Sequence, residues 1–266
     1  MDFISYYIIN KVKAYNKVQW IHFDIDSIGI NTKFCKNIYE KFDYIFAVSE
    51  EAKNKLINLI PTLKDKTGVL QNIISPNTIH NLADKGETFP DDFEGTRILT
   101  VGRVSHEKGQ YMTIPVLARL KKDGYNVRWY CVGQGNDLEN CKDIVKGYNL
   151  EKDYIFLGVN KNPYTIMKDC DIYVQPSIHE GFCITLAEAR CFNSPIVTTN
   201  FLNADKHVKD GYTGLIADIN EESIYKNIKK ILDDNELKNK IENNLFNNNP
   251  DTRGEIKKLE NIIDKR

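Results

Sequence analysis

From Arg97 to Asp218 the sequence alternates short apolar segments with stretches of helical composition, which limits the folds that the chain can adopt. The apolar segments include "RILTVGR", "VRWYCVGQG", "DYIFLG" and "DIYVQPS". Such runs of apolar residues are typical of parallel strands that are covered on both faces. Strands that alternate with helices at this spacing predict a doubly wound parallel sheet of the α/β class.

The segment around "HEGFCITLAEA" carries the residues that are most informative about function. It is predicted to form the end of a strand, a glycine turn and a helix over 183–192. Glu180 lies in the turn and Glu188 lies in the helix, with seven residues between them. A helix amino terminus at the carboxyl edge of a sheet is a ready phosphate site. Two acids beside it predict hydrogen-bond acceptors for hydroxyl groups rather than a metal cage.

Two other strand ends carry residues suited to ligand binding. Arg103 and Lys108 bracket the short loop between the strand "RILTVGR" and the next helix. Arg offers a fork of donors and Lys a point charge, and both suit the charges of a diphosphate. The next strand ends in Gly133-Gln134-Gly135, where the backbone can approach a ligand closely. Three strand ends of one sheet are therefore expected to meet a ligand.

Taken in order, "VGRVSHEKG", "VGQG", "FLGVNKNPY", "DIYVQPS", "HEGFCITLAEA" and "SPIVTTN" resemble segments of the retaining glycosyltransferases of family 4. An isolated pair of acids at this spacing occurs by chance in many proteins, whereas the ordered set is specific. The resemblance implies a GT-B fold, in which two Rossmann-like domains face each other across a cleft. It also implies transfer of a sugar from a nucleoside-diphosphate-sugar to an acceptor hydroxyl, with retention of configuration, in polysaccharide or glycolipid synthesis.

The resemblance assigns roles to individual residues, and each role has a plainer alternative. Arg103 and Lys108 would hold the diphosphate, or they form a solvated pair at a strand end. Glu188 would accept hydrogen bonds from ribose hydroxyls, or it is a surface residue of a helix. Glu180 would lie beside the transferred sugar, or it caps a helix. The implied donor-binding set is Gly102, Arg103, Lys108, Gly133, Val159, Asn160, Glu180, Gly181, Phe182, Cys183, Ile184 and Glu188.

The implied catalytic set is Glu180, Arg103, Lys108 and His22. His22 follows an apolar segment, where related enzymes carry a histidine near the anomeric carbon, although a lone histidine there is more often a core residue. Asp24 and Asp26 are either acceptor-binding acids or turn residues. Val159, Asn160 and the turn Asn162-Pro163-Tyr164 match the region that contacts the base, or they belong to an ordinary loop before a helix.

The predicted domain organisation has three parts. Residues 1–85 match only the closing part of a GT-B amino-terminal domain, which lies on the acceptor side and is incomplete here. Residues 86–242 form the nucleotide-sugar-binding domain, which a polar linker precedes. Residues 243–266 are expected to form a terminal helix that crosses back to the first domain.

Composition and charge exclude some classes of binding partner and indicate the compartment. The 266-residue chain has a formal net charge of −1, which argues against a protein that binds nucleic acid through phosphate attraction. The six cysteines show no metal-ligand spacing and suggest a reducing compartment. With no apolar run near the ~20 residues of a membrane span and no secretory leader, the chain is expected to be cytoplasmic.

The expected partners are a nucleotide-sugar donor and a carbohydrate or lipid-linked acceptor, with peripheral contact at the inner membrane face left open. No cofactor and no metal ion are expected.

Three other functions compete with a transferase. A glycosidase would use Glu180 and Glu188 as paired carboxylates and would need neither Arg103 nor Lys108. A sugar-nucleotide epimerase also uses the GT-B architecture, although the spacing of the two acids fits transferases better. A non-catalytic nucleotide-sugar-binding protein is consistent with the shortened first domain.

Overall fold

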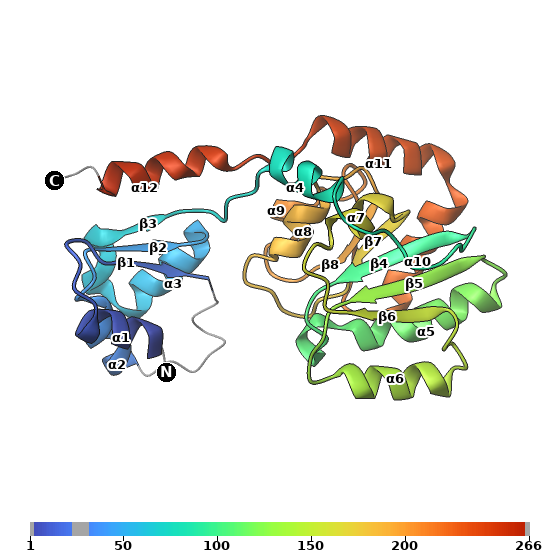
Figure 1. The fold of residues 1–266 in the computed structure, drawn as a ribbon, viewed down its shortest axis with the longest axis horizontal. Helices are drawn as coiled ribbons and strands as arrows, with labels where there is room; N and C mark the ends of the chain where they lie inside the picture. The colour runs from blue at the N-terminus through green and yellow to red at the C-terminus, as the bar shows by residue number, and fades with distance from the viewer. Residues whose placement is uncertain (1–2, 23–31, 264–266) are drawn as a thin grey trace. The chain divides into compact units, whose positions relative to one another are not determined.

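The protein is described by a computed structural model that covers residues 3–22 and 32–263 (Figure 1). The chain divides into two compact units, one formed by Met1–Ile74 and Asp251–Arg266 and the other by Ser75–Pro250. Asp24 and Asp26 lie outside the described residues. Within the described part of the chain, no helix is long and apolar enough to cross a membrane.

The second unit is built on a six-stranded parallel sheet in the order β6-β5-β4-β7-β8-β9. Its strands are β4 (Thr96–Val101), β5 (Val127–Val132), β6 (Tyr154–Gly158), β7 (Ile172–Gln175), β8 (Ile196–Thr199) and β9 (Leu215–Ala217). The chain adds β5 and β6 on one side of β4, and then β7, β8 and β9 on the other side. The direction in which successive strands are added thus reverses between β4 and β7. In doubly wound sheets, ligands bind at such a reversal of strand order, outside the carboxyl ends of the strands.

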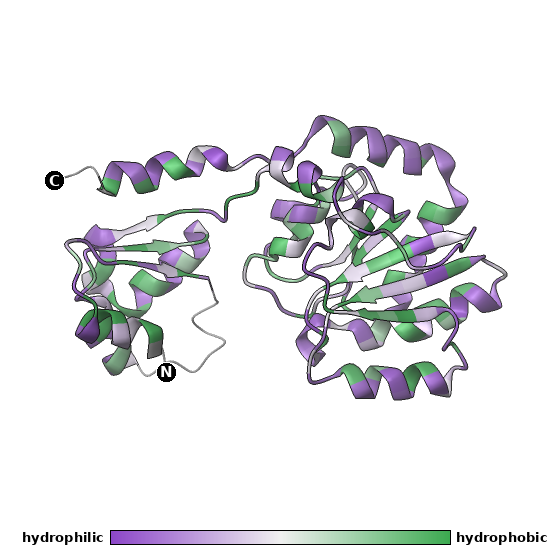
Figure 2. Ribbon diagram, in the orientation of Figure 1, coloured by the Kyte–Doolittle hydropathy of each residue, from purple (hydrophilic) through white to green (hydrophobic). Residues whose placement is uncertain are grey.

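The core of the second unit lies on both faces of this sheet. Every residue of β7 and β8 is buried, as are most residues of β4 and β5. Figure 2 shows hydrophobic residues along the strands and a mixture of hydrophobic and hydrophilic residues on the helices. Burial on both faces explains why the strands read as continuous apolar runs, and it confirms the predicted α/β class.

The helices of the second unit pack on the sheet and on one another. Helix α5 packs against α6 and α10, whereas α4 packs against α7. The helices are α4 (Pro76–Ala83), α5 (Gln110–Lys122), α6 (Leu138–Gly147), α7 (Tyr164–Asp169), α8 (Ile184–Ala189), α9 (Ala204–His207), α10 (Glu221–Asp233) and α11 (Asn235–Asn247).

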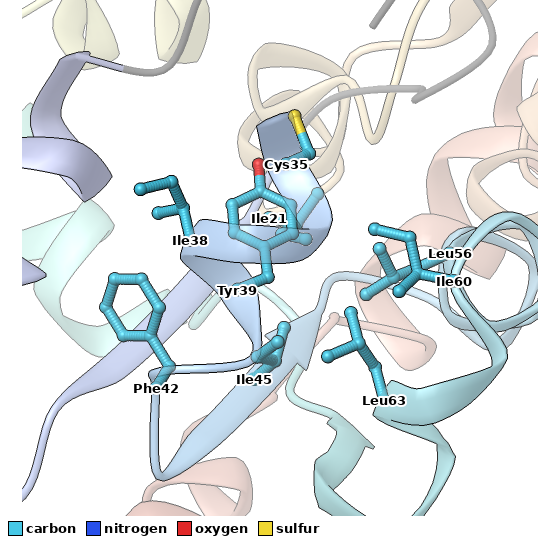
Figure 3. Close-up of a cluster of buried hydrophobic side chains, with 9 residues drawn as sticks. All are labelled: Ile21, Cys35, Ile38, Tyr39, Phe42, Ile45, Leu56, Ile60 and Leu63. Atoms are coloured by element: carbon cyan, nitrogen blue, oxygen red, sulfur yellow. The ribbon is translucent and has the colours of Figure 1, made fainter. Parts of the chain in front are cut away.

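The first unit contains a three-stranded parallel sheet in the order β1-β2-β3. Its elements are α1 (Phe3–Lys11), β1 (Val18–Ile21), α2 (Thr32–Tyr39), β2 (Tyr44–Ala47), α3 (Glu50–Leu59), β3 (Thr67–Val69) and α12 (Ile256–Ile263). Figure 3 shows a cluster of its buried side chains, formed by Ile21, Cys35, Ile38, Tyr39, Phe42, Ile45, Leu56, Ile60 and Leu63. These residues come from two strands, two helices and the turns between them, so the unit has a core of its own.

The carboxy-terminal segment returns to the first unit beside β3. Thr252 donates a hydrogen bond to the carbonyl of Asn72 at 2.8 Å and accepts one from the amide of Ile74 at 2.7 Å. The carboxylate of Glu255 accepts from the amide of Gln71 at 3.1 Å. These bonds occupy backbone groups that follow an edge strand and would otherwise need water.

The unit boundaries differ from the predicted domain boundaries at residues 85 and 242. Residues 76–83 were assigned to the first domain and the linker, but they form α4, which packs on α7. The Thr165 hydroxyl of α7 donates to the carbonyl of Ala83 at 3.0 Å. Helix α11 runs on to Asn247, so the segment that returns to the first unit begins at Asp251.

Candidate functional site

Backbone hydrogen bonds tie three strand ends together at the carboxyl edge of the sheet. The amide of Gly102 donates to the carbonyl of Val132 at 2.9 Å, and the amide of Gly133 donates to the carbonyl of Gly158 at 2.7 Å. Gly133 has a φ of +142°, and a Cβ at this position would lie 1.8 Å from the carbonyl oxygen of Gly102. Only glycine lets the loops after β4 and β5 approach this closely.

Lys108 and Glu180 meet at the reversal of the sheet. Lys108 ends a short 3-10 turn after β4, and Glu180 lies in the loop after β7. The Lys108 Nζ lies 2.6 Å from Glu180 Oε2, and the Glu180 side chain is only 5% exposed. The amide of Ile178 donates to the carbonyl of Glu107 at 2.9 Å, which ties the two loops together. The sheet order therefore brings a cation and an acid from distant parts of the sequence into one ion pair.

The second oxygen of Glu180 is held from within the protein. Ser177 Oγ donates to Glu180 Oε1 at 2.7 Å, and Gln175 Nε2 lies 3.4 Å from the same oxygen. Gln175 Nε2 also donates to Ser177 Oγ at 2.8 Å. On its other side, Gln175 Oε1 accepts from the Tyr173 hydroxyl at 2.9 Å and from Thr185 Oγ1 at 3.3 Å. This network satisfies polar groups that would be costly to bury alone.

The loop between Glu180 and α8 has a strained backbone. Cys183 is the residue before α8, is buried, and has a φ of +60°, which is uncommon for a residue other than glycine. Burial raises the pKa of the Cys183 thiol, and the nearby Glu180 carboxylate adds to the increase. Gly181 and Phe182 are half-buried, whereas Ile184 is exposed. The helix that follows spans only Ile184–Ala189, so the predicted helix over 183–192 is too long at both ends.

Glu188 is half-buried and contacts a tyrosine of α7. The Tyr164 hydroxyl donates to Glu188 Oε1 at 2.8 Å. Partial burial raises the pKa of the Glu188 carboxyl, and the hydrogen bond from Tyr164 partly offsets that increase. Burial and the adjacent carboxylate raise the pKa of Tyr164, so its hydroxyl stays a donor at neutral pH. Tyr164 thus orients one oxygen of the Glu188 carboxylate. Glu188 and Lys108 belong to the same unit.

The other predicted site residues have varied surroundings. Arg103 is exposed, and its carbonyl accepts from the buried Gln110 amide at 2.8 Å. Val159 is 67% exposed, and the Asn160 side chain accepts from the amide of Asn162 at 2.8 Å. These contacts leave both readings of Val159 and Asn160 open, because an ordinary loop would make them too.

His22 belongs to the first unit. Its ring lies 4.8 Å from the ring of Trp20, and it is exposed rather than buried in the core. Although the residue is exposed, neighbouring groups partly desolvate its ring and lower the pKa of His22, and a hydrogen bond with Asn72 partly offsets that change. Its role beside a sugar stays a prediction.

His207 supports the loop after Glu180 and was not singled out in the sequence. It ends α9, is 6% exposed, and its ring packs edge-on against Phe182 with the centroids 4.8 Å apart. Burial lowers the pKa of His207 to about 4, although a hydrogen bond to the backbone of Phe182 opposes that change. At neutral pH this ring is therefore an uncharged packing partner.

Acid is expected to destabilise the second unit through His207. Its pKa is about 4 in the folded protein against an ordinary value of 6.5, so the unfolded chain binds the proton first as the pH falls. The free energy of unfolding should then decrease from about pH 6.5 downward, by at most about 3 kcal/mol near pH 4. Urea denaturation at pH 7, 6 and 5 measures this slope. In His207→Gln the slope should become shallower, and an identical slope in both proteins would contradict the assignment.

Several site residues carry signals that the sequence reading did not use. Tyr173, Gln175 and Ser177 are polar groups at alternate positions of a strand that is otherwise apolar, so they share one face. Such a pattern inside a buried strand indicates a hydrogen-bonded network. Nothing in the local sequence marks His207, because its contact depends on how α9 packs. The turn that contains Tyr164 was singled out, but its bond to Glu188 depends on how α7 packs.

Comparison with known families identifies relatives of this chain. Residues 89–247, which are more than half of the chain, match the family described as "Glycosyl transferases group 1". An N-acetylgalactosamine-N,N'-diacetylbacillosaminyl-diphospho-undecaprenol 4-alpha-N-acetylgalactosaminyltransferase of Campylobacter jejuni is 27% identical over 216 residues, covering 80% of this chain and 57% of the relative. The capsular polysaccharide biosynthesis glycosyltransferase CapM of Staphylococcus aureus is 29% identical over 219 residues, covering 75% and 55%. The chain thus spans about half the length of the curated relatives it matches.

Solved structures show the same fold. Anabaena HepE in complex with UDP-glucose superposes with a TM-score of 0.78 at 18% identity, covering 94% of this chain and 72% of that one. TarM of S. aureus, in complex with UDP among other ligands, superposes with a TM-score of 0.72 at 17% identity, covering 94% and 51%. This likeness confirms the predicted GT-B fold class.

Proposed function

Because the chain belongs to the group 1 glycosyltransferases, we propose that it transfers a sugar from a nucleoside-diphosphate-sugar to an acceptor hydroxyl with retention of configuration. The observation that carries the proposal is the pair formed by Lys108 and Glu180, at the point where a doubly wound sheet binds ligands. A cation suited to a diphosphate there adjoins an acid suited to sugar hydroxyls. The two groups match the two halves of such a donor.

In the proposed reaction the protein stabilises the leaving group. The bond between the anomeric carbon and the diphosphate oxygen breaks, and negative charge develops on the departing nucleotide. Lys108 and Arg103 supply fixed positive charge for it, which is commonly among the largest contributions to catalysis. The acceptor attacks from the same face, and its hydroxyl proton passes to the leaving phosphate. No metal ion or other cofactor is part of this proposal.

The remaining residues of the proposed site orient the donor. Glu188, held by Tyr164, accepts hydrogen bonds from the ribose hydroxyls. The backbone of Val159 and Asn160 meets the base, and the loop from Gly181 to Ile184 meets the sugar and phosphate. His22, a residue of the first unit, remains a proposed catalytic residue.

Relatives suggest which substrates to test first. One relative is named for an undecaprenol-linked acceptor and another for capsular polysaccharide, and one structural neighbour holds UDP-glucose. We therefore propose a nucleotide-sugar donor and a carbohydrate or lipid-linked acceptor in surface-polysaccharide or glycolipid synthesis. A cytoplasmic protein with peripheral contact at the inner membrane face fits such an acceptor.

A second candidate is a non-catalytic protein that binds a nucleotide-sugar. It would need only the second unit, which by itself contains both the Lys108–Glu180 ion pair and the bond between Tyr164 and Glu188. This candidate keeps the donor site and lacks turnover, so binding assays alone do not separate it from the transferase.

Product analysis tests the proposed function. The protein is incubated with UDP-, GDP- and ADP-sugars and with polyprenyl-linked or oligosaccharide acceptors, and nucleotide release is followed by chromatography. We expect one donor to be consumed only when an acceptor is present, and the new glycosidic bond to keep the donor's anomeric configuration by NMR. Donor binding without consumption would favour the non-catalytic candidate. Inversion would refute the proposed stereochemistry.

A further inference from the structure

We propose that Gln175 is a positioning residue, an inference that rests on the proposed function. It helps to hold one carboxylate oxygen of Glu180, so that the other oxygen can accept a hydrogen bond from the transferred sugar. Gln175 is the last residue of β7 and is 1% exposed, so its amide is fixed inside the sheet. It does not contact a ligand in this proposal. It acts on the reaction through Ser177 and Glu180.

The contacts determine which way the amide of Gln175 points. In its ion pair with Lys108, the Glu180 carboxylate can only accept hydrogen bonds, so the amide atom facing it must be the donor Nε2. The Tyr173 hydroxyl and Thr185 Oγ1 both donate to the amide oxygen on the opposite side. The amide oxygen thus faces two donors, and Nε2 faces two acceptors, Ser177 Oγ and Glu180 Oε1, so this orientation satisfies the whole network.

The two oxygens of Glu180 have different partners. Ser177 and Gln175 hold Oε1 at 2.7 Å and 3.4 Å, whereas Oε2 faces Lys108 at 2.6 Å. When a donor diphosphate attracts Lys108, Oε2 becomes an acceptor for a hydroxyl of the transferred sugar. If Oε1 were not held, the carboxylate could rotate and present either oxygen, and the sugar would lose its fixed orientation.

The position of Gln175 on the strand supports a dedicated role. Tyr173, Gln175 and Ser177 occur at every second position, so they lie on one face of the strand and its extension. An apolar residue at position 175 would fill the same space without the cost of burying an amide. The amide instead links a tyrosine inside the sheet to the acid at its edge.

A labelling experiment tests the positioning without requiring turnover. The variant Gln175→Met keeps the volume of the side chain and removes both polar atoms. We expect Lys108 to be acetylated by N-hydroxysuccinimide acetate severalfold faster than in the unaltered protein, because a mobile Glu180 no longer holds it. Peptide mass spectrometry measures that rate. The control Thr113→Val removes a buried hydroxyl that bonds Tyr154 at 2.9 Å, outside this network, and should leave Lys108 labelling unchanged.

Kinetics with the donor found by product analysis give a second readout. In Gln175→Met, kcat should fall about tenfold, the size expected for a lost hydrogen bond to a charged group, while the Kd for the nucleoside diphosphate of that donor stays unchanged. A general loss of structure would weaken binding of the nucleoside diphosphate as well. If Gln175→Met does not fold, Tyr173→Phe removes only the hydroxyl that anchors the amide and should show the same changes more weakly.

The possible results separate this inference from the proposed function. Faster Lys108 labelling in Gln175→Met, together with a lower kcat, supports the positioning role. Labelling and kcat both at the unaltered level would overturn it, whatever the donor is. An unaltered protein that turns over no donor would count against the transferase, and the labelling rates would still decide whether Gln175 holds Glu180.

Discussion

Lys108→Ala should lower kcat/KM by about 2 to 4 kcal/mol of transition-state stabilisation, which is roughly 30- to 1000-fold. The proposed role of this cation is to stabilise the charge of the departing diphosphate. The Lys108 Nζ is 2.6 Å from Glu180, so the variant also leaves a buried carboxylate without its cation. Steady-state kinetics at a temperature where both proteins are folded measure the effect on catalysis.

Lys121→Ala is the matched control for this loss. Lys121 lies in the last turn of α5, the helix that follows the Lys108 loop. Its Nζ lies 2.8 Å from Oδ1 of Asp153, the residue before β6. It therefore removes a paired cation at the opposite edge of the sheet. We expect kcat/KM in Lys121→Ala to stay within about twofold of the unaltered value, as for a partly exposed ion pair away from the site. A loss of less than threefold in Lys108→Ala would contradict its catalytic role.

Gly133→Ala should destabilise the second unit by about 3 kcal/mol or more. The added Cβ would lie 1.8 Å from the carbonyl oxygen of Gly102, and the residue has a φ of +142°. Backbone atoms cannot move aside without breaking the bonds between the ends of β4, β5 and β6. Chemical denaturation measures the change, followed by the fluorescence of the buried Trp129 in β5 after Trp20 of the first unit is replaced by Phe in both proteins.

Gly147→Ala provides the comparison for that substitution. A Cβ at Gly147, the last residue of α6, would meet nothing within 4 Å. Alanine should therefore be tolerated there, with a change within about 1 kcal/mol of zero. If Gly133→Ala cost no more than Gly147→Ala, the close approach of the two loops would be wrong.

The class of fold was predictable because buried parallel strands have a distinctive local pattern. Continuous apolar runs alternate with helical stretches, and this pattern does not depend on which strands pair. The pairing of Lys108 with Glu180 was not predictable in that way. It requires β4 to lie beside β7, and strand order follows from the packing of the whole sheet rather than from any single segment.

Other features escaped prediction for different physical reasons. Helix α8 begins only at Ile184, because the backbone at Cys183 turns through a left-handed conformation that composition does not reveal. Residues 76–83 read as a polar linker, yet Pro76 and the Ser75 cap begin a helix there. The network through Gln175 left a visible trace, since its polar residues alternate along an apolar strand, but its partners are known only from the fold.

The most direct test of the donor site is a thermal shift assay with a panel of UDP-, GDP- and ADP-sugars. We predict that one donor raises the Tm of the unaltered protein and of Lys121→Ala, with stabilisation of about 2.7 kcal/mol at a hundred times Kd. The same donor should give little or no shift in Lys108→Ala and Glu188→Ala, which lack the proposed phosphate and ribose partners. A shift that persists undiminished in both of these variants would place the nucleotide elsewhere and contradict the account.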